Sequence, residues 1–180
     1  LAGAAMFITA GARLSHIALL GVAGIILLMS IAFMRPYVMD RLTTFLDPTS
    51  DPLGSSYQIQ QSLIAIGSGG VLGRGYGQSI QKFAYLPEPI GDSVFAVYAE
   101  EFGFLGTTIL IGILALFTFR GFKIATQASD RFSMLLVVGI MTLIVTQAFL
   151  NIAAMVGLAP LSGLPLPFLS HGGTALLATL

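Results

Sequence analysis

The residues best suited to chemistry lie in the segment 82–101, where prolines and a glycine interrupt an otherwise apolar sequence. Pro87 and Pro89 disfavour a helix. Gly91 allows a turn, so we expect a new helix to begin at Asp92. The Asp92 carboxylate suits two roles. It can cap the free N–H groups of that helix, or it can act as a general base, because partial desolvation beside a hydrophobic segment raises a carboxyl pKa.

Two further acids, Glu100 and Glu101, follow Asp92 on the same predicted helix. Adjacent helical positions point about 100° apart, so the two side chains do not face one pocket. We expect one of them to be buried and paired while the other reaches the membrane interface. Structural duty is the favoured interpretation of this pair.

Residues 67–77, GSGGVLGRGYG, contain six glycines in eleven positions. Their spacing matches neither the dinucleotide-binding fingerprint nor the P-loop, which excludes nucleotide binding in this segment. Glycines let backbone N–H groups approach a ligand closely, and Arg74 lies among them as a candidate substrate contact. A flexible loop is the favoured interpretation of this segment.

A second proline-rich loop, at 158–172, runs into a glycine pair at its end. This pair predicts the start of a helix whose N–H groups attract anions such as phosphate. Ser170 and Gly172 are counted among the candidate substrate contacts. His171 either binds phosphate or forms an interfacial hydrogen bond, which is the more common role of such a histidine.

The composition indicates a membrane protein. Of the 180 residues, 9% are charged and 56% are hydrophobic, and the mean hydropathy is +0.91. A soluble domain needs about a quarter of its residues charged. The formal net charge is zero, so nothing favours nucleic acid as a partner. Cysteine is absent and only two histidines occur, which excludes disulfides and zinc sites built from Cys and His clusters.

Three long stretches carry no charge: 17–34 and 102–119, of 18 residues each, and 132–150, of 19 residues. At 1.5 Å per residue, each approaches the roughly 30 Å hydrocarbon core of a bilayer. The alternative is a buried helix of a large soluble protein, which the composition disfavours.

The predicted fold is therefore all-α, a polytopic transmembrane helix bundle. Its complete spans are expected at 17–34, 94–120 and 132–157. Two partial spans are expected at 1–12 and 173–180, so both ends of the chain look cut.

Charge placement predicts the orientation of the spans. The short loops beside them carry Arg13, Arg120, Lys123 and Arg131 against a single acid. Because short basic loops stay in the cytoplasm, the loop 121–131 is expected there. The large loop 35–93, with short helices of its own, and the loop 158–172 then lie outside the cytoplasm.

Within the large outer loop, the segment 55–66 predicts a short amphipathic helix. Ile59, Leu63 and Ile66 recur at helical spacing and share one face. Such a helix either lies on the membrane surface or packs against neighbouring helices.

Three sequence blocks resemble the family that includes FtsW, RodA and SpoVE. They read RLTTFLDPTSDPLGSSYQIQQSLIAIGSGGVLGRGYG at 41–77, QKFAYLPEPIGDSVFAVYAEEFGFLG at 81–106 and GLPLPFLSHGGTALL at 163–177. With the helices between them, the resemblance covers essentially the whole chain. Gln81-Lys82-Phe83 is closer to the FtsW branch than to RodA.

The resemblance implies the C-terminal half of a ten-helix enzyme of the bacterial plasma membrane, located at the division septum. Such enzymes polymerise lipid II into peptidoglycan glycan strands. The implied partners are lipid II, a class B penicillin-binding protein and other division proteins.

In this family the acid that opens the helix after the large outer loop is essential for polymerisation, and Asp92 occupies that position. Glu88, Lys82 and Gln81 match motif positions beside the same outer cavity. This chain has Ile90-Gly91 where many relatives have His-Thr, and His171 where Tyr is usual. Because of these departures, the resemblance does not identify the residues that contact the acceptor sugar.

The implied chemistry is an inverting glycosyl transfer, which needs a base and no protein nucleophile. Asp92 is the candidate base. Lys82, Arg74 or a divalent cation such as Mg²⁺ would neutralise the departing diphosphate. Asp92 is the one candidate ligand for such a cation, and a single carboxylate supplies few of the oxygen ligands that a magnesium site needs.

Two other functions remain open. A lipid II flippase needs polar groups at membrane depth, and the charge-free cores of the three spans disfavour such a path in this part of the protein. A non-catalytic scaffold for division proteins would leave Asp92 dispensable.

Overall fold

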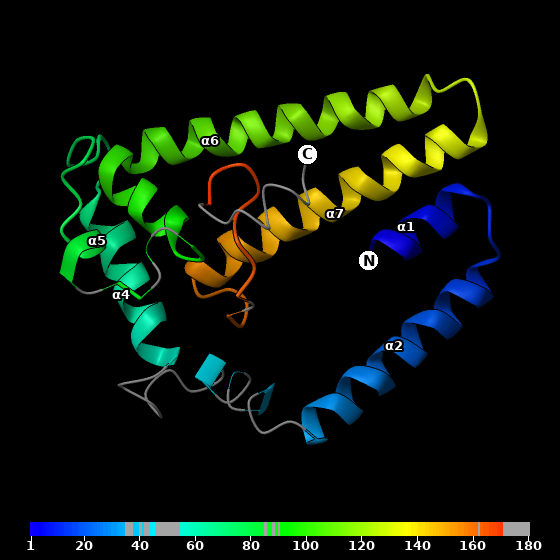
Figure 1. Cartoon of the computed structure of the whole chain (residues 1–180), viewed down its shortest axis with the longest axis horizontal. Helices are drawn as coiled ribbons and strands as arrows, with labels where there is room; N and C mark the ends of the chain where they lie inside the picture. Colours follow the sequence, from blue (N-terminus) through cyan, green and yellow to red (C-terminus); the bar gives the residue numbers. More distant parts are fainter. Residues whose placement is uncertain are drawn as a thin grey trace. The chain divides into compact units, whose positions relative to one another are not determined.

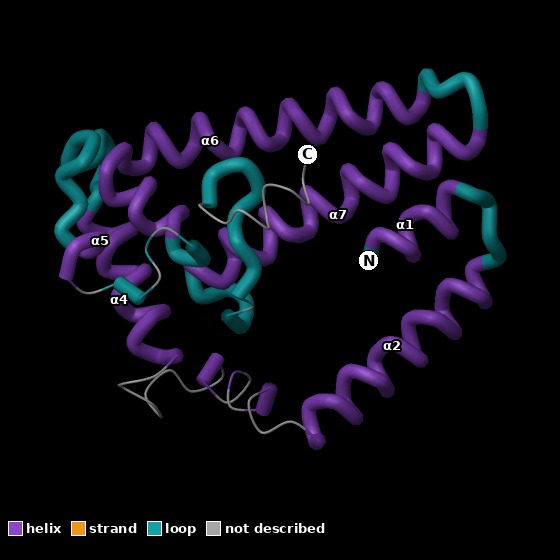
Figure 2. Tube along the Cα trace, in the orientation of Figure 1, coloured by secondary structure: helices purple, strands orange, loops and turns teal. Residues whose placement is uncertain are grey.

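The computed structural model describes residues 1–34, 38–39, 41, 44–45, 55–84, 86–87, 89, 91–161 and 163–170. All the regular secondary structure of these residues is helical, which confirms the predicted all-α class (Figures 1 and 2). The helices are α1 (Ala2–Thr9), α2 (Leu14–Met34), α4 (Ser55–Ser68), α5 (Gln81–Ala84), α6 (Val94–Thr126) and α7 (Arg131–Met155). The predicted partial span at 173–180 lies outside the described residues.

The chain divides into two compact units. The first combines Leu1–Asp40 with Leu114–Thr146, and the second combines Arg41–Ile113 with Gln147–Leu180. The boundary between the units falls inside both α6 and α7. Each of these two helices therefore has one part in the first unit and one part in the second.

In the first unit, glycines bring helices close together. A Cβ atom on Gly121 of α6 would lie 2.7 Å from Cγ of Met141 on α7. A Cβ atom on Gly139 of α7 would lie 2.8 Å from Sδ of Met6 on α1. Small residues at helix contacts are typical of membrane bundles, where close backbone approach replaces the hydrophobic effect.

Helices α6 and α7 are each long and apolar enough to cross a membrane, and only 22% of the most apolar window of each is buried. A core helix of a soluble protein would be mostly buried. The exposed side chains include large apolar ones such as Ile113, Phe119 and Leu143. Exposed apolar helix surface on this scale fits lipid or further helices better than water.

The helix ends differ slightly from those predicted. Helix α6 continues to Thr126, six residues beyond the expected end at 120, so the predicted loop 121–131 is shorter than expected. Helix α7 begins at Arg131, where the Asp130 carboxylate accepts hydrogen bonds from the Ser133 N–H and hydroxyl, both at 2.8 Å. These bonds hold the pKa of Asp130 below its ordinary value.

In the second unit, α4 packs largely through small residues. Its buried face carries Ser56, Ile59, Ser62, Ala65 and, just past its end, Gly69. Of the predicted apolar stripe, Ile59 is buried and Ile66 packs against the core, whereas Leu63 is 44% exposed. Small side chains let α4 approach its neighbours, and the Ser62 hydroxyl lies 3.4 Å from Sδ of Met155 on α7. Of the two predicted placements for this helix, the contacts favour packing against neighbouring helices.

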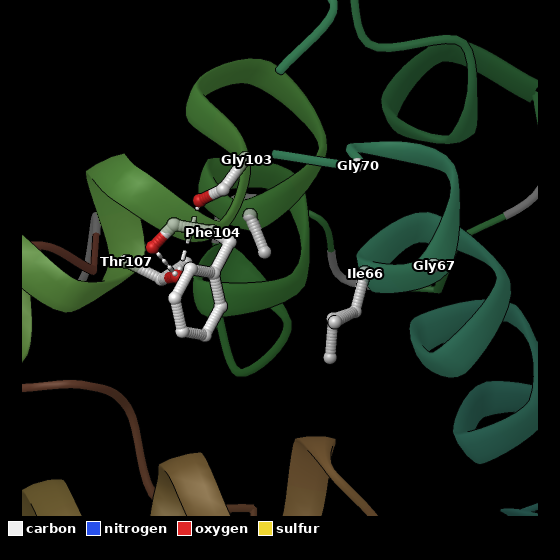
Figure 3. A pocket seen from close by; sticks show the side chains of 7 residues that line it. Ile66, Gly67, Gly70, Gly103, Phe104 and Thr107 are labelled. Carbon is white, nitrogen blue, oxygen red and sulfur yellow. Dashed lines mark hydrogen bonds between the residues drawn. The ribbon is translucent and has the colours of Figure 1, made fainter. Parts of the chain in front are cut away.

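Helix α6 is broken at Gly103, whose φ of 65° and ψ of −162° are not helical. A break leaves backbone N–H and C=O groups without partners inside the helix. Residues 69–75, which we call the glycine clasp, supply those partners. Figure 3 shows Gly70 of the clasp and Gly103 of the break at a pocket that Ile66, Phe104 and Thr107 also line. The carbonyls of Gly70 and Val71 accept the N–H groups of Phe104 and Leu105 at 2.9 and 3.1 Å.

The clasp also bonds the first half of α6. The N–H groups of Arg74 and Gly75 donate to the carbonyls of Glu100 and Glu101, each at 3.0 Å. All four backbone hydrogen bonds join the clasp to residues of α6 on one side or the other of Gly103. The broken helix is therefore closed by main-chain groups of the loop that precedes it in the sequence.

Backbone contact of this kind requires glycine. A Cβ atom on Gly69 would lie 3.0 Å from the carbonyl carbon of Ala99, and one on Gly73 would lie 2.6 Å from that of Glu101. A Cβ atom on Gly103 would lie 2.8 Å from the carbonyl carbon of Val71. The glycines of 67–77 thus bring the loop against a helix backbone, and the prediction of a flexible loop is wrong for the clasp.

Candidate active site

Asp92 lies in a short turn directly before α6 and is half-buried. The helix begins at Val94, where the span 94–120 was predicted to begin, so the helix start expected at Asp92 lies two residues too early. The carbonyl of Ser93 accepts the N–H of Ala96 at 3.0 Å, so Ser93 and not Asp92 occupies the N-cap position. Asp92 therefore stands just outside the helix, one residue before its N-cap.

Three polar side chains anchor the backbone of this turn. Ser93 is fully buried, and its hydroxyl donates to the carbonyl of Pro87 at 3.1 Å. Ser170 donates its hydroxyl to the carbonyl of Gly91 at 2.8 Å. Asn151 of α7 donates through Nδ2 to the carbonyl of Asp92 at 2.8 Å. The turn is therefore held at each of its three residues.

The loop 158–170 is bonded to the same anchors. Asn151 Nδ2 also donates to the carbonyl of Leu164 at 2.7 Å, and the Ser170 hydroxyl accepts the N–H of Leu166 at 2.7 Å. One turn earlier on α7, Gln147 Nε2 donates to the carbonyl of Pro165 at 2.9 Å. This loop and the Asp92 turn thus form one hydrogen-bonded assembly at the end of α7.

The Asp92 carboxylate lies beside a guanidinium group. A Cβ atom built on Gly163 would be 3.5 Å from Asp92 Oδ2 and 3.7 Å from both terminal nitrogens of Arg41. The Arg41 guanidinium also donates a hydrogen bond to the carbonyl of Leu161. A carboxylate and a guanidinium therefore meet at a glycine, whose missing side chain leaves both groups room.

Two of the predicted substrate contacts, Arg74 and Gln81, bond a different acid, Glu100. Arg74 forms an ion pair with it, with Nη1 3.5 Å from Oε1. The backbone N–H of Gln81 donates to Glu100 Oε2 at 3.3 Å, and Oε1 of Gln81 is buried without a hydrogen-bond partner among the described residues. Lys82 follows on α5, half-buried, with Nζ 5.8 Å from the centre of the Phe83 ring.

The Glu100 carboxylate is fully buried and saturated with donors. Besides Arg74 and the Gln81 N–H, it accepts the Ser79 hydroxyl at 2.6 Å and the Ile80 N–H at 3.2 Å. Glu101 is 6% exposed, and its Oε1 has no hydrogen-bond partner among the described residues. The expectation that one of the two acids reaches the interface is therefore wrong, because the glycine clasp packs against this end of the helix.

Ser170 was expected to contact the substrate, but its hydroxyl is used inside the protein. Its hydroxyl is buried and bonded at both its donor and acceptor sides within the protein. Glu88, His171 and Gly172 lie outside the described residues.

Sequence reasoning did not select Arg41, Asn151 or Gly163 as site residues. Asn151 gave a usable signal, because a buried amide inside an apolar span needs partners. Arg41 and Gly163 gave none on their own. Their place at Asp92 depends on the fold, since Arg41 and its partner Leu161 are 120 residues apart.

The described donors at Asp92 do not fit a divalent cation. A magnesium site takes several oxygen ligands, whereas here one carboxylate lies beside a guanidinium. Among the described residues, no three His, Cys, Asp or Glu side chains form a group that could hold a metal. The arrangement suits proton transfer at the carboxylate and recognition of an anion by the guanidinium.

The family model of the FtsW/RodA/SpoVE cell cycle proteins matches residues 1–180. The chain is 44% identical over 171 residues to stage V sporulation protein E of Bacillus subtilis, covering 95% of this chain and 47% of that protein. It is 47% identical over 163 residues to a probable peptidoglycan glycosyltransferase FtsW of Synechocystis, covering 91% of this chain and 41% of that protein.

A solved structure shares the fold. It is described as "Structural coordination of polymerization and crosslinking by a peptidoglycan synthase complex". The TM-score is 0.70 at 29% identity, over 97% of this chain and 48% of that one. The chain thus spans about half the length of the curated relatives and the solved chain that it matches.

Proposed function

Because this chain belongs to the FtsW/RodA/SpoVE family, we propose that the longer protein polymerises lipid II into peptidoglycan glycan strands. Asp92 is the general base of that reaction. Relatives carry the name probable peptidoglycan glycosyltransferase FtsW, which supports the reaction class. The description of the family as cell cycle proteins supports a role in cell division.

The observation that carries the proposal is the fixing of Asp92. Asn151 and Ser170 hold backbone carbonyls of its turn, the Ser93 hydroxyl ties the turn to Pro87, and the Asp92 carboxylate lies at Gly163 with the Arg41 guanidinium beside it. A catalytic group must be held in a productive geometry, because a misplacement of about 1 Å can cost 100-fold in rate. A residue of the surface alone needs no such fixing.

The reaction follows from these groups. The 4-hydroxyl of the acceptor sugar attacks the anomeric carbon of the donor muramyl sugar while the Asp92 carboxylate takes the hydroxyl proton. The bond between this carbon and the diphosphate oxygen breaks, and the lipid diphosphate leaves with the electron pair. A single displacement converts the α-linked donor into a β-linked product.

Two cationic groups are proposed to stabilise the leaving diphosphate. Arg41 lies beside Asp92, and a guanidinium matches phosphate oxygens with paired donors. Lys82 is the second group, on α5. Arg74 is a weaker candidate than the sequence suggested, because it is paired with Glu100. Mg²⁺ remains a prediction of the sequence, and no step here depends on it.

We further propose that the protein acts in the bacterial plasma membrane at the division septum, beside a class B penicillin-binding protein. Two helices able to cross a membrane support the membrane location. The solved structure with the same fold belongs to a complex that couples polymerisation to crosslinking, which supports a transpeptidase partner.

The test uses the full-length protein with its penicillin-binding partner and labelled lipid II. Asp92→Asn and Asp92→Ala should reduce glycan formation by about 100-fold or more, the usual contribution of a general base. Asp130→Asn, an acid in the loop before α7, is the matched control and should polymerise as wild type. Unchanged polymer from both Asp92 variants would refute the assignment. Lipid movement across vesicles that survives these substitutions would favour the flippase.

A further inference from the structure

We propose that Asn151 is a positioning residue for Asp92, acting through the main chain of the catalytic turn. The inference rests on the proposed function, since it names the residue that aims the base. Asn151 lies on α7, 59 positions away from Asp92 in the sequence, and it is 2% exposed.

The Asn151 side chain uses its amide nitrogen twice. Nδ2 donates to the carbonyl of Asp92 at 2.8 Å and to the carbonyl of Leu164 at 2.7 Å. Both partners are carbonyl oxygens, which only accept hydrogen bonds, so the nitrogen must be the atom that faces them. One carboxamide therefore ties the Asp92 turn to the loop that carries Gly163.

The other half of the same amide supports this interpretation. Oδ1 of Asn151 is buried and has no hydrogen-bond partner among the described residues. A buried acceptor without a partner costs free energy. The residue therefore contributes through its two N–H groups.

The two hydrogen bonds of Asn151 fix the position of Asp92 relative to the loop that carries Gly163. Asp92 Oδ2 and the Arg41 guanidinium both lie within 4 Å of the Cβ position of Gly163, the residue directly before Leu164. Releasing Asn151 frees the carbonyl of Asp92 and this loop together. The carboxylate then loses its fixed direction towards the acceptor hydroxyl, while Lys82 on α5, the second proposed diphosphate-binding group, lies outside this loop.

Gln147 provides the matched control. It lies one turn earlier on α7 and donates to the carbonyl of Pro165 at 2.9 Å, so it holds the same loop. Its recorded bond does not reach the Asp92 turn. A purely structural contribution of the loop would make the two amides equivalent, whereas positioning of Asp92 depends on Asn151.

The experiment compares four variants of the full-length protein with its penicillin-binding partner. Asn151→Leu and Gln147→Met replace each amide by an apolar side chain of similar shape. Asn151→Asp keeps the shape and places acceptor oxygens against the two carbonyls. Asp92→Asn is the reference. The kcat and KM for lipid II are measured per folded molecule, with the folded amount taken from a monodisperse fraction and its thermal unfolding.

Both Asn151 variants should lower kcat by about 100-fold at a KM within about twofold of wild type. Gln147→Met should keep kcat within about threefold. Equal losses in the Asn151 and Gln147 variants, or a raised KM with kcat preserved, would overturn the positioning role. So would an Asn151→Asp variant with the wild-type kcat.

Failure of the proposed function gives a different result. If Asp92→Asn polymerises lipid II at the wild-type rate, the base assignment falls, and the positioning role falls with it. If Asp92→Asn is inactive while both Asn151 variants are fully active, the base assignment stands and only the positioning role is lost.

Discussion

Asp92 and Glu100 are both acids near the beginning of α6, and their surroundings differ. The Glu100 carboxylate accepts two backbone N–H groups and a hydroxyl, and it forms an ion pair with Arg74. At Asp92, the Asn151 side chain donates to the backbone carbonyl. The first carboxylate is fully buried and the second is half-buried.

This difference separates structural from chemical duty. The Glu100 carboxylate is fully buried and is held by groups of the protein, so a substrate hydroxyl has no access to it. Asp92 is half-buried on a turn whose main chain is fixed, so it combines a defined position with access for a substrate. Access together with a fixed main chain therefore indicates which of the two acids does the chemistry.

On the structural side of this comparison, the largest loss of stability is expected from a substitution in the glycine clasp. Gly69→Ala should lower the free energy of unfolding by about 3 kcal/mol, because the added Cβ meets backbone atoms that cannot move aside cheaply. Thermal unfolding of the full-length protein measures the loss. Gly67→Ala is the control: nothing lies within 4 Å of its Cβ position, so this helical position should be unchanged or slightly stabilised.

Glu100→Gln comes next and tests the comparison directly. The amide replaces one acceptor oxygen by a donor in a site full of donors, which should cost about 2 kcal/mol of stability. Polymerisation per folded molecule should stay within about threefold of wild type. Asp92→Asn should do the reverse, keeping the melting temperature while losing activity. A Glu100→Gln protein that melts normally but makes no glycan would contradict the division of duties.

Ser93→Ala should have a smaller effect, about 1 kcal/mol, because it removes one neutral hydrogen bond to the carbonyl of Pro87. Its Oγ also accepts the Gln58 side chain at 3.0 Å. Thermal unfolding of Ser93→Ala and Gln58→Ala checks the assignment. The two variants should lose similar stability, and a large loss in only one of them would show that the pair does not act as a unit.

Asp130→Ala should give the smallest effect, and one that depends on pH. The pKa of Asp130 is lowered in the folded protein by hydrogen bonds from Ser133. Its stabilising contribution is therefore present above the ordinary aspartate pKa and is lost as the pH falls through the lowered one. The variant should melt about 2 °C below wild type at neutral pH. This difference should shrink in acid, and a difference that grows in acid would contradict the cap.

The sequence predicted the features that depend on local pattern. Apolar stretches of membrane-spanning length identified α6 and α7, and the prolines before Gly91 located the turn that carries Asp92. The break at Gly103 was not predictable in the same way. Gly106 and Gly112 follow in the same apolar stretch and remain helical, and only the clasp, about 30 residues earlier, distinguishes Gly103 from them.

The surroundings of Asp92 were missed for a similar reason. Asn151 and Arg41 reach their partners across 59 and 120 residues, and no short-range pattern records such contacts. The sequence also placed Arg74 with the substrate because it lies among glycines. Its partner Glu100 was visible as an acid, but the pairing depends on the clasp that brings the two together.

The broken helix has a consequence for how the protein is made. Residues 69–75 precede α6 in the chain, so they leave the ribosome before the segment that they will close. When the two halves of α6 emerge, the main-chain partners for the interruption already exist. A segment with unmatched polar groups is costly inside a bilayer, and the chain order supplies the groups that close the interruption before the interruption itself is made.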